Sequence, residues 1–414
     1  MIDYLKKLTI KNAGFEIIDR GDCQLLSELI IEKIDETVSY NTLRRIFGLA
    51  NYVKPNTSTL DTLARFNGYK NYVHFLKINP YEAYWSDKEK LYHLLHDDSE
   101  SLLHFLNGMD YKSEQALNFM ISLCRELVYL DQQALLNEVF HSDFFNERHF
   151  SYSETLHFGN SVGMLFKTYS LSDDKLLLNP NFLKYVYCIY VDYSNLNGYY
   201  GDWCLYVSTT TSDIQIKCFS LAVLELKKYL NGLPVSYDFF SSLSISDFHP
   251  ILIGRLFSVQ LLSYQYGSND ITVFFNTIKK SPPENVLDFL YEPIIVALLS
   301  RNFLLMDMIL KFILNEKVKV NYYYHEHHMN LFRLLTLFNS KFESNELTTL
   351  KNKDFVLEEG YFKYSYKEII MLLIYVYKFH TSEDADFQLN AYKLLSKKLN
   401  YPLFSKVYLF NYFN

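Results

Sequence analysis

Residues 38–48 read Val38-Ser-Tyr-Asn-Thr-Leu-Arg-Arg-Ile-Phe-Gly48, which is a complete local pattern for one short helix. Ser39 is a preferred N-cap residue, because its hydroxyl can accept a hydrogen bond from an unpaired N–H of the first turn. Val38 and Leu43 are spaced to form a hydrophobic staple, which fixes the direction in which the chain enters the helix. Gly48 stands where a helix commonly ends, since glycine adopts the left-handed conformation readily. The stretch therefore predicts a helix that begins after Ser39 and ends before Gly48.

This predicted helix is amphipathic. Leu43, Ile46 and Phe47 share one face at helical spacing, and we expect that face to pack inward. The other face is polar, and arginine can bond guanine bidentately, asparagine can bond adenine, and hydroxyls can bond phosphate. With one lysine of the following turn, the candidate DNA-binding residues are Ser39, Tyr40, Asn41, Thr42, Arg44, Arg45 and Lys54. The alternative is a small helical domain in which the two arginines are only solvated.

The flanking sequence predicts further helices on both sides of this one. Upstream, apolar residues recur with helical period at Leu25, Leu26, Leu29, Ile30 and Ile34. Downstream, residues 54–57 break the chain, and Ser58 with Asp61 predicts a capping box for a helix that ends at Gly68. A short helix over residues 72–76 completes a compact unit of about four or five helices within residues 1–80.

Together these residues resemble the phage-repressor-like helix-turn-helix domains, and more closely a version frequent in proteins of the Bacteroidetes. The matching positions are Ser39, Thr42, Leu43, Arg45, Phe47, Gly48, Leu49, Pro55, Thr59, Leu60, Leu63, Ala64, Gly68 and Tyr69. The resemblance covers about the first 80 residues, and it implies that the helix after Ser39 enters the major groove of double-stranded DNA. Residues 35–38 depart from the repressor pattern, because this turn lacks the usual glycine and looks about two residues longer.

Charge is distributed unevenly between this region and the rest of the chain. The 414 residues are 49% hydrophobic, enough to bury a large core, and the length predicts two or three domains. The formal net charge is −7, made up of +2 in residues 1–80 and −9 beyond them. Only the first region suits a phosphate backbone, and its modest charge means that tight binding needs a homodimer.

The sequence gives no sign of secretion, a membrane segment or a disulfide framework. The five cysteines are scattered without a C-x-x-C spacing, which fits a reducing cytoplasm and argues against a zinc site. The first residues have no apolar segment of the kind found in signal peptides. The longest apolar runs, near residues 293–299 and 369–377, are far shorter than the roughly 20 residues that span a bilayer. We therefore expect a cytoplasmic protein that does not contact a membrane.

The rest of the chain is predicted to be helical almost throughout, so the fold class is all-α. Residues 81–414 form one α-helical repeat-like region, a solenoid or irregular bundle, with a candidate division near residues 230–250. Residues 199–207 are predicted as helix in preference to strand. The other segments with helical spacing are 88–95, 114–128, 153–169, 214–230, 250–264, 286–299, 303–314 and 366–379. No named repeat signature recurs at a fixed period.

The sequence contains none of the catalytic or metal-binding motifs that we considered. His325 and His328 lie three residues apart, not four as in the H-E-x-x-H zinc motif, so we predict no metal site and no cofactor. Residues 159–163 and 198–201 lack the Lys-Ser/Thr ending of a phosphate loop, and no G-x-S-x-G elbow occurs. The 36 tyrosines and 33 phenylalanines are expected to fill helix interfaces in preference to lining a groove. We therefore do not predict an enzyme.

Two functions from different classes remain open. The first is a DNA-binding transcriptional regulator whose helical region dimerises or senses a ligand, such as a peptide or protein. The second is a helical-repeat scaffold or sensor for protein interactions, in a setting such as phage defence, whose first domain docks a protein in place of DNA.

Overall fold

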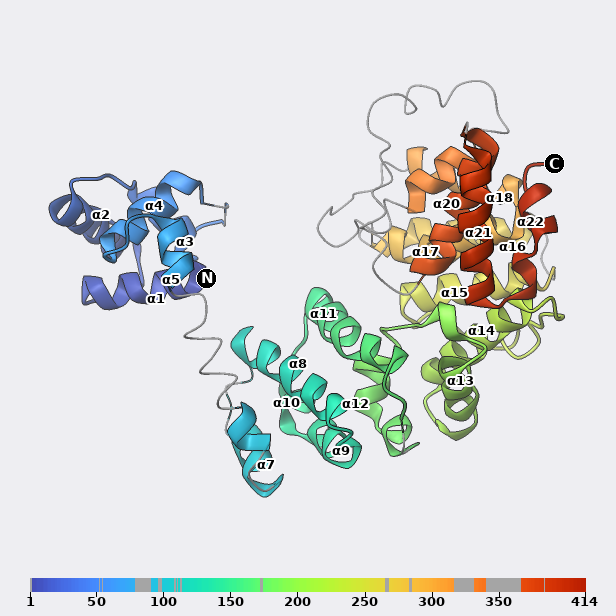
Figure 1. The fold of residues 1–414 in the computed structure, drawn as a ribbon, viewed down its shortest axis with the longest axis horizontal. Coiled ribbons are helices and arrows are strands. Elements are labelled where there is room, and N and C mark those ends of the chain that lie inside the picture. Colours follow the sequence, from blue (N-terminus) through green and yellow to red (C-terminus); the bar gives the residue numbers. More distant parts are fainter. Residues whose placement is uncertain are drawn as a thin grey trace. The chain divides into compact units, whose positions relative to one another are not determined.

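The computed structural model describes residues 2–51, 53, 55–78, 91–95, 99–107, 109, 111, 114–171, 174–264, 268–282, 285–315, 331–339, 366–382 and 384–414 (Figure 1). Within these residues the fold is all-α and contains no strand, which confirms the predicted class. The chain divides into two compact units, residues 1–102 and 103–414. We call the helices α1–α5 of the first unit the head and the second unit the body.

The head consists of helices packed around one apolar core. They are α1 (Ile2–Ala13), α2 (Arg20–Ile34), α3 (Tyr40–Ile46), α4 (Thr57–Phe66) and α5 (Tyr72–Ile78) (Figure 1). Leu43 and Ile46 of α3 are buried in this core, as the periodicity predicts, while Phe47 just beyond the helix is only partly buried. The remaining core side chains include Leu5, Leu26, Ile30, Leu63, Phe66 and Phe75.

Both ends of α3 lie where the sequence predicts them. The Ser39 hydroxyl accepts a hydrogen bond from the Thr42 N–H at 3.2 Å, and Val38 beside it is buried. Gly48 has φ +79°, and the next N–H, that of Leu49, donates to the Arg44 carbonyl at 2.8 Å. This bond closes a Schellman turn, which satisfies a carbonyl that the end of the helix leaves unpaired.

The predicted cap of α4 is wrong by two residues. Asn56, and not Ser58, is the N-cap, and its side-chain oxygen accepts a hydrogen bond from the Thr59 N–H at 2.7 Å. An asparagine directly after the chain-breaking proline offers a cap earlier, which adds residues 57 and 58 to the helix. Asp61 accepts a bond from the Tyr72 N–H at 2.8 Å, so it holds the start of α5 in place. The helix ends before Gly68, which has φ +87°, as predicted.

Side chains hold the turn between α2 and α3, which has no glycine. Asp35 adopts the left-handed conformation at φ +53°, which aspartate tolerates better than most residues. The next residue, Glu36, forms an ion pair with Arg65 of α4 and accepts a hydrogen bond from the Thr62 hydroxyl at 2.7 Å. Ser27 of α2 donates to the Val38 carbonyl at 2.6 Å. The turn is thereby fastened both to α2 and to α4.

We expect Glu36→Gln to loosen this turn. Hydrogen bonds from Arg65 and then Thr62 lower the pKa of Glu36 below its usual 4.5. The ionised carboxylate therefore stabilises the head above pH 4.5, and this contribution is lost as the pH falls through the lowered pKa. Because both side chains are partly exposed, we expect a loss of only about 0.5–1 kcal/mol at neutral pH.

Amide hydrogen exchange in α2 and α4 of the full chain measures this loss. Exchange should be faster in Glu36→Gln than in the wild type at pH 7, and the two rates should converge below pH 4.5. Glu28→Gln, at an exposed position on α2, is the control with the same charge change. Equal protection of wild type and Glu36→Gln at pH 7 would show that the ion pair does not hold the turn.

The body is a succession of helices in which neighbours along the chain pack together. Its helices after α7 (Ser99–Asn107) are α8 (Glu114–Tyr129), α9 (Gln133–His141), α10 (Asp143–Glu147), α11 (Tyr152–Gly163), α12 (Pro180–Phe182), α13 (Tyr199–Thr210), α14 (Ile214–Leu230), α15 (Pro250–Leu262), α16 (Ser268–Lys280), α17 (Val286–Ser300), α18 (Phe303–Asn315), α20 (Lys367–Thr381), α21 (Ala385–Leu399) and α22 (Lys406–Phe410). Contacts join α13 to α14, α14 to α15, α15 to α17, and α20 to α21 (Figure 1).

Several predicted boundaries in the body agree closely with the observed helices. The prediction for residues 214–230 matches α14 at both ends, and residues 199–207 lie inside α13, so helix and not strand is confirmed there. Of the segment predicted at 88–95, only residues 91–95 are described, and they are helical. Residues 231–249, the candidate division, connect α14 to α15 without a long helix, and these two helices pack against each other. The boundary proposed at residue 80 lies among residues that are not described.

Aromatic rings fill many of the interfaces between body helices. Phe140 of α9 contacts Phe158 of α11 edge-on at 6.1 Å between ring centroids, and Phe182 of α12 at 5.4 Å. The rings of Tyr193 and Tyr366 are stacked at 3.5 Å, although 173 residues separate them in the sequence. All five rings are buried, which is the role expected of them.

Glu292 of α17 is the centre of a buried polar cluster. Its carboxylate pairs with Arg255 of α15 at 2.5 Å and accepts hydrogen bonds from the hydroxyls of Tyr193 at 2.7 Å and Tyr366 at 2.6 Å. Burial raises the pKa of both tyrosines well above that of an exposed tyrosine, so both remain donors. The four side chains are buried and satisfy one another, which is what makes a buried charge tolerable.

We expect Arg255→Met to destabilise the body strongly, by about 3–5 kcal/mol, because it leaves the Glu292 carboxylate buried without its counter-charge. The double variant Arg255→Met with Glu292→Leu should recover part of this loss, since it removes both charges together. Thermal unfolding of the two single variants and the double variant forms a double-mutant cycle. Additive effects would show that the two side chains act independently.

Candidate nucleic-acid interface

The polar face of α3 is on the surface of the head, and some of its side chains are hydrogen-bonded to one another. Ser39, Asn41 and Arg45 are exposed, whereas Tyr40, Thr42 and Arg44 are half-buried. The hydroxyls of Ser39 and Thr42 are hydrogen-bonded at 2.9 Å, and Arg44 donates to the Asn41 side-chain oxygen at 3.4 Å. Six of the seven candidate residues therefore lie together at α3, and Lys54 lies outside the described residues.

Arg20 belongs to this surface and is missing from the candidates chosen from the sequence. It is the first residue of α2, and its guanidinium donates to the Tyr40 hydroxyl at 3.2 Å and lies 5.0 Å from the centre of the Tyr40 ring. A cation over a tyrosine face is favourable and holds both side chains in place. The sequence offered no local signal for this contact, because Arg20 lies 20 residues before Tyr40 and outside the apolar period predicted at residues 25–34.

The outward face of α2 has a different character from that of α3. Leu25 and Ile31 are 51% and 42% exposed, and the glutamates Glu28 and Glu32 are exposed on the same helix. Acidic side chains repel phosphate, and exposed aliphatic side chains gain nothing from a polar backbone. This face therefore suits a protein partner better than it suits DNA.

No family model, curated protein or solved structure matches this chain. The interpretation of the head as a helix-turn-helix domain therefore stays a prediction, and it depends on the head's own residues and their geometry. Those comprise the capped helix α3, the fastened turn before it, and the exposed polar face with Arg20 beside it.

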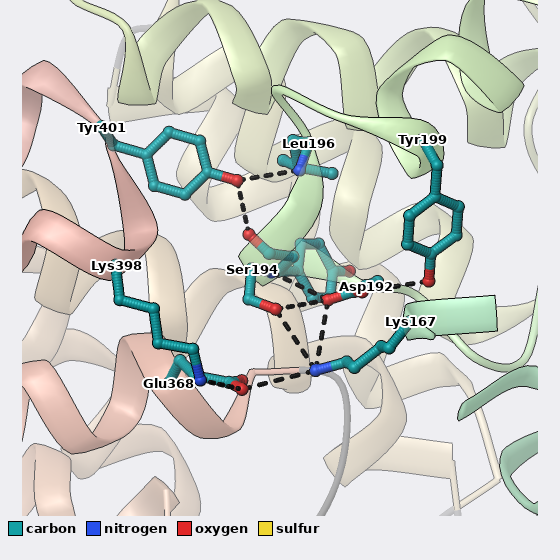
Figure 2. A network of polar contacts seen from close by, with 9 residues as sticks. Lys167, Asp192, Ser194, Leu196, Tyr199, Glu368, Lys398 and Tyr401 are labelled. Carbon is teal, nitrogen blue, oxygen red and sulfur yellow. Dashed lines mark hydrogen bonds and ion pairs between the residues drawn. The ribbon is translucent and has the colours of Figure 1, made fainter. Parts of the chain in front are cut away.

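A second polar cluster lies in the body and has the composition of a serine–lysine catalytic pair. Lys167 lies 3.2 Å from the Ser194 hydroxyl, which in turn donates to the buried Asp192 carboxylate at 2.5 Å (Figure 2). Lys167 also forms ion pairs with Asp192 and Glu368, each at 3.4 Å. Burial alone would lower the pKa of Lys167, but Asp192 and the other anionic partners outweigh it and raise the pKa above its ordinary value.

The charges around Lys167 favour a structural role for this cluster over a catalytic one. A lysine that activates a serine must be neutral, and a raised pKa keeps Lys167 protonated. The cluster instead joins distant segments, since Glu368 of α20 bonds both Lys167 and Lys398, while the Tyr401 hydroxyl accepts from the Leu196 N–H at 2.9 Å (Figure 2). It fastens the last helices of the body to the segment around residues 192–196.

The body also has a small cavity against the Glu292 cluster, lined by α14, α15 and α17. Its volume is about 10 Å³, which is room for no more than one water molecule. Tyr193, Arg255 and Glu292 face it together with aliphatic side chains. A cavity of this size holds no substrate, and it belongs to the packing around the buried ion pair.

Metal clusters, disulfides and membrane-spanning helices are absent from the described part of the chain. No three histidine, cysteine, aspartate or glutamate side chains gather there in a way that would hold a metal, and His325 and His328 lie outside it. All five cysteines are described and form no disulfide, and Cys188 is the one that is not fully buried. Among the described helices, none is long and apolar enough to cross a membrane.

Proposed function

We propose that the chain is a DNA-binding regulator whose head places α3 in the major groove. The observation that carries the proposal is the construction of α3. One face is fixed in the core by Leu43 and Ile46, both ends are capped, and the opposite face presents Asn41 and Arg45 to solvent. Side chains held on a rigid element are what base recognition needs.

The neighbouring side chains support contacts to the DNA backbone. Arg20 and Tyr40, which contact each other at the start of α2 and α3, combine a cation with a phenol hydroxyl, and both groups bond phosphate. Ser39 at the N-cap of α3 adds an exposed hydroxyl near the first N–H groups of that helix. Base-reading and phosphate-binding groups are thus adjacent on one side of the head.

We further propose that the regulator acts as a homodimer. The helix α3 has seven residues and the region 1–80 has a formal charge of only +2, so one head makes few phosphate contacts. Two heads on one DNA molecule double these contacts and the number of bases read. The body, as the larger unit, is the natural site for pairing and for sensing a ligand, a peptide or a protein.

A second candidate function is favoured by the outward face of α2. Leu25 and Ile31, exposed among glutamates, fit a protein partner, so the head would dock a protein and the body would serve as a scaffold or sensor. The two functions differ in a DNA-binding measurement: the regulator predicts an affinity that falls steeply with salt, and the protein-docking function predicts no such dependence.

The DNA-binding proposal is tested by charge reversal with a matched control. The variant Arg44→Glu with Arg45→Glu should weaken binding to a labelled random-sequence duplex by at least about tenfold, since each arginine contact contributes about 1–3 kcal/mol. The control Lys11→Glu with Lys70→Glu changes the net charge equally at exposed head positions away from α3. Fluorescence anisotropy with the full chain, at several salt concentrations, gives both affinities.

Wild-type affinity should fall steeply with salt, with a slope of log K against log salt of about −0.9 per phosphate contacted. The α3 variant should have a shallower slope than the Lys11/Lys70 control. A wild-type affinity that does not respond to salt, or equal losses in both double variants, would contradict the proposal. The first of these results would favour the protein-docking function.

A further inference from the structure

Helix α21 has an apolar stripe on the surface of the body. Its inner face, with Gln388, Tyr392 and Leu399, is buried, and the helix packs against α20 (Figure 1). On another side of the helix, Phe387 and Leu394 are 62% and 74% exposed. They are seven residues apart, so they lie above each other along one side of the helix, which is the spacing of a two-helix seam.

The charges along α21 are divided between its two ends. Asp384 caps the helix and Asp386 lies in its first turn, whereas Lys393, Lys397 and Lys398 lie toward its C-terminus. If two such helices pair in parallel, like charges face each other. If they pair antiparallel, the acidic end of each lies beside the basic end of the other, and the helix dipoles also oppose favourably.

We propose that α21 is the surface through which two copies of this chain pair, antiparallel and about a two-fold axis. In this arrangement Phe387 of one copy packs against Leu394 of the second copy, and Asn390 lies next to the axis. Asp386 then lies beside Lys393 of the second copy. The same patch is used on both chains, as a two-fold interface requires.

Two exposed apolar side chains seven residues apart, together with charges of opposite sign at the two ends, distinguish α21 from α13. Leu205 of α13 is 58% exposed, but Asp202 is the one charged residue of that helix, so α13 offers no opposite charge to a second copy. Pairing through α21 would bury Phe387 and Leu394, which is favourable. The opposite charges at the two ends of the helix favour a second copy that runs antiparallel.

This inference deepens the proposed function, which needs two heads, and it is tested without DNA so that the two can fail separately. Sedimentation equilibrium should give the wild-type full chain a dimer mass. Phe387→Asp with Leu394→Asp should raise the dimer dissociation constant at least tenfold, because it places like charges in the seam. Leu205→Asp, an exposed leucine on another helix, is the control and should remain a dimer. Circular dichroism verifies that every variant is helical.

Two further variants test the direction of pairing. Asp386→Lys alone should weaken the dimer, because it meets Lys393 of the second copy, and adding Lys393→Asp to the same chain should restore it. Under mild oxidation, Asn390→Cys should cross-link two chains through the axis, whereas the wild type, whose cysteines are mostly buried, should not.

The possible results all bear on the proposal. A monomeric wild type, or a dimer unaffected by the Phe387/Leu394 variant, would overturn it. A dimer without restoration by the charge exchange and without the cross-link would overturn the antiparallel arrangement. An intact dimer that does not bind DNA would contradict the proposed function and leave the α21 surface standing.

Discussion

Glu292 lies in the interior of the body, and its carboxylate must be satisfied there because water does not reach it in quantity. Arg255 neutralises its charge, and the hydroxyls of Tyr193 and Tyr366 complete its hydrogen bonds. These partners come from α15, from the segment before α13, and from the residue before α20. Breaking any one contact leaves a buried charge with too few partners, so the cluster forces these segments to assemble together. The last helices are thereby tied to the middle of the chain.

The second polar cluster extends the same constraint to the surface. Glu368, the second residue of α20, forms ion pairs with Lys167 and Lys398, and the Tyr401 hydroxyl donates to the Tyr193 carbonyl at 2.8 Å. These contacts hold the α20–α21 pair at the end where α20 begins and α21 finishes. Its orientation decides which side of α21 faces solvent, so the exposure of Phe387 and Leu394 depends on polar contacts deep in the body as much as on the sequence of α21.

The parts of the fold that could be predicted are those determined by neighbouring residues. Ser39, Leu43 and Gly48 define α3 within ten residues, and the apolar periodicity of α14 gives both of its ends. The cap of α4 was misplaced because two good cap residues, Asn56 and Ser58, lie two positions apart, and the sequence alone does not rank them. Neighbouring residues could not predict the contact of Arg20 with Tyr40, which lie 20 positions apart. Nor could they predict the cluster around Glu292, in which Tyr193 and Tyr366 lie 173 positions apart. A weak signal existed for the latter, since Arg255 is the one charged residue of α15.

The uneven charge of the chain links the two proposals, DNA contact by the head and pairing of two chains. A region with a net charge of −9, as beyond residue 80, repels a DNA backbone, whereas residues 1–80 carry a net charge of +2. Under the proposed function, the attraction of DNA to a single head would be small, because its few phosphate contacts would be opposed by long-range repulsion from the body. The proposed pairing through α21 would supply a second head, and the second head would then bind the same DNA at a high effective concentration. Salt screens the repulsion as well as the attraction, so the measured salt dependence reports the balance between them. A steep dependence in spite of this compensation would require that close contacts at α3 dominate.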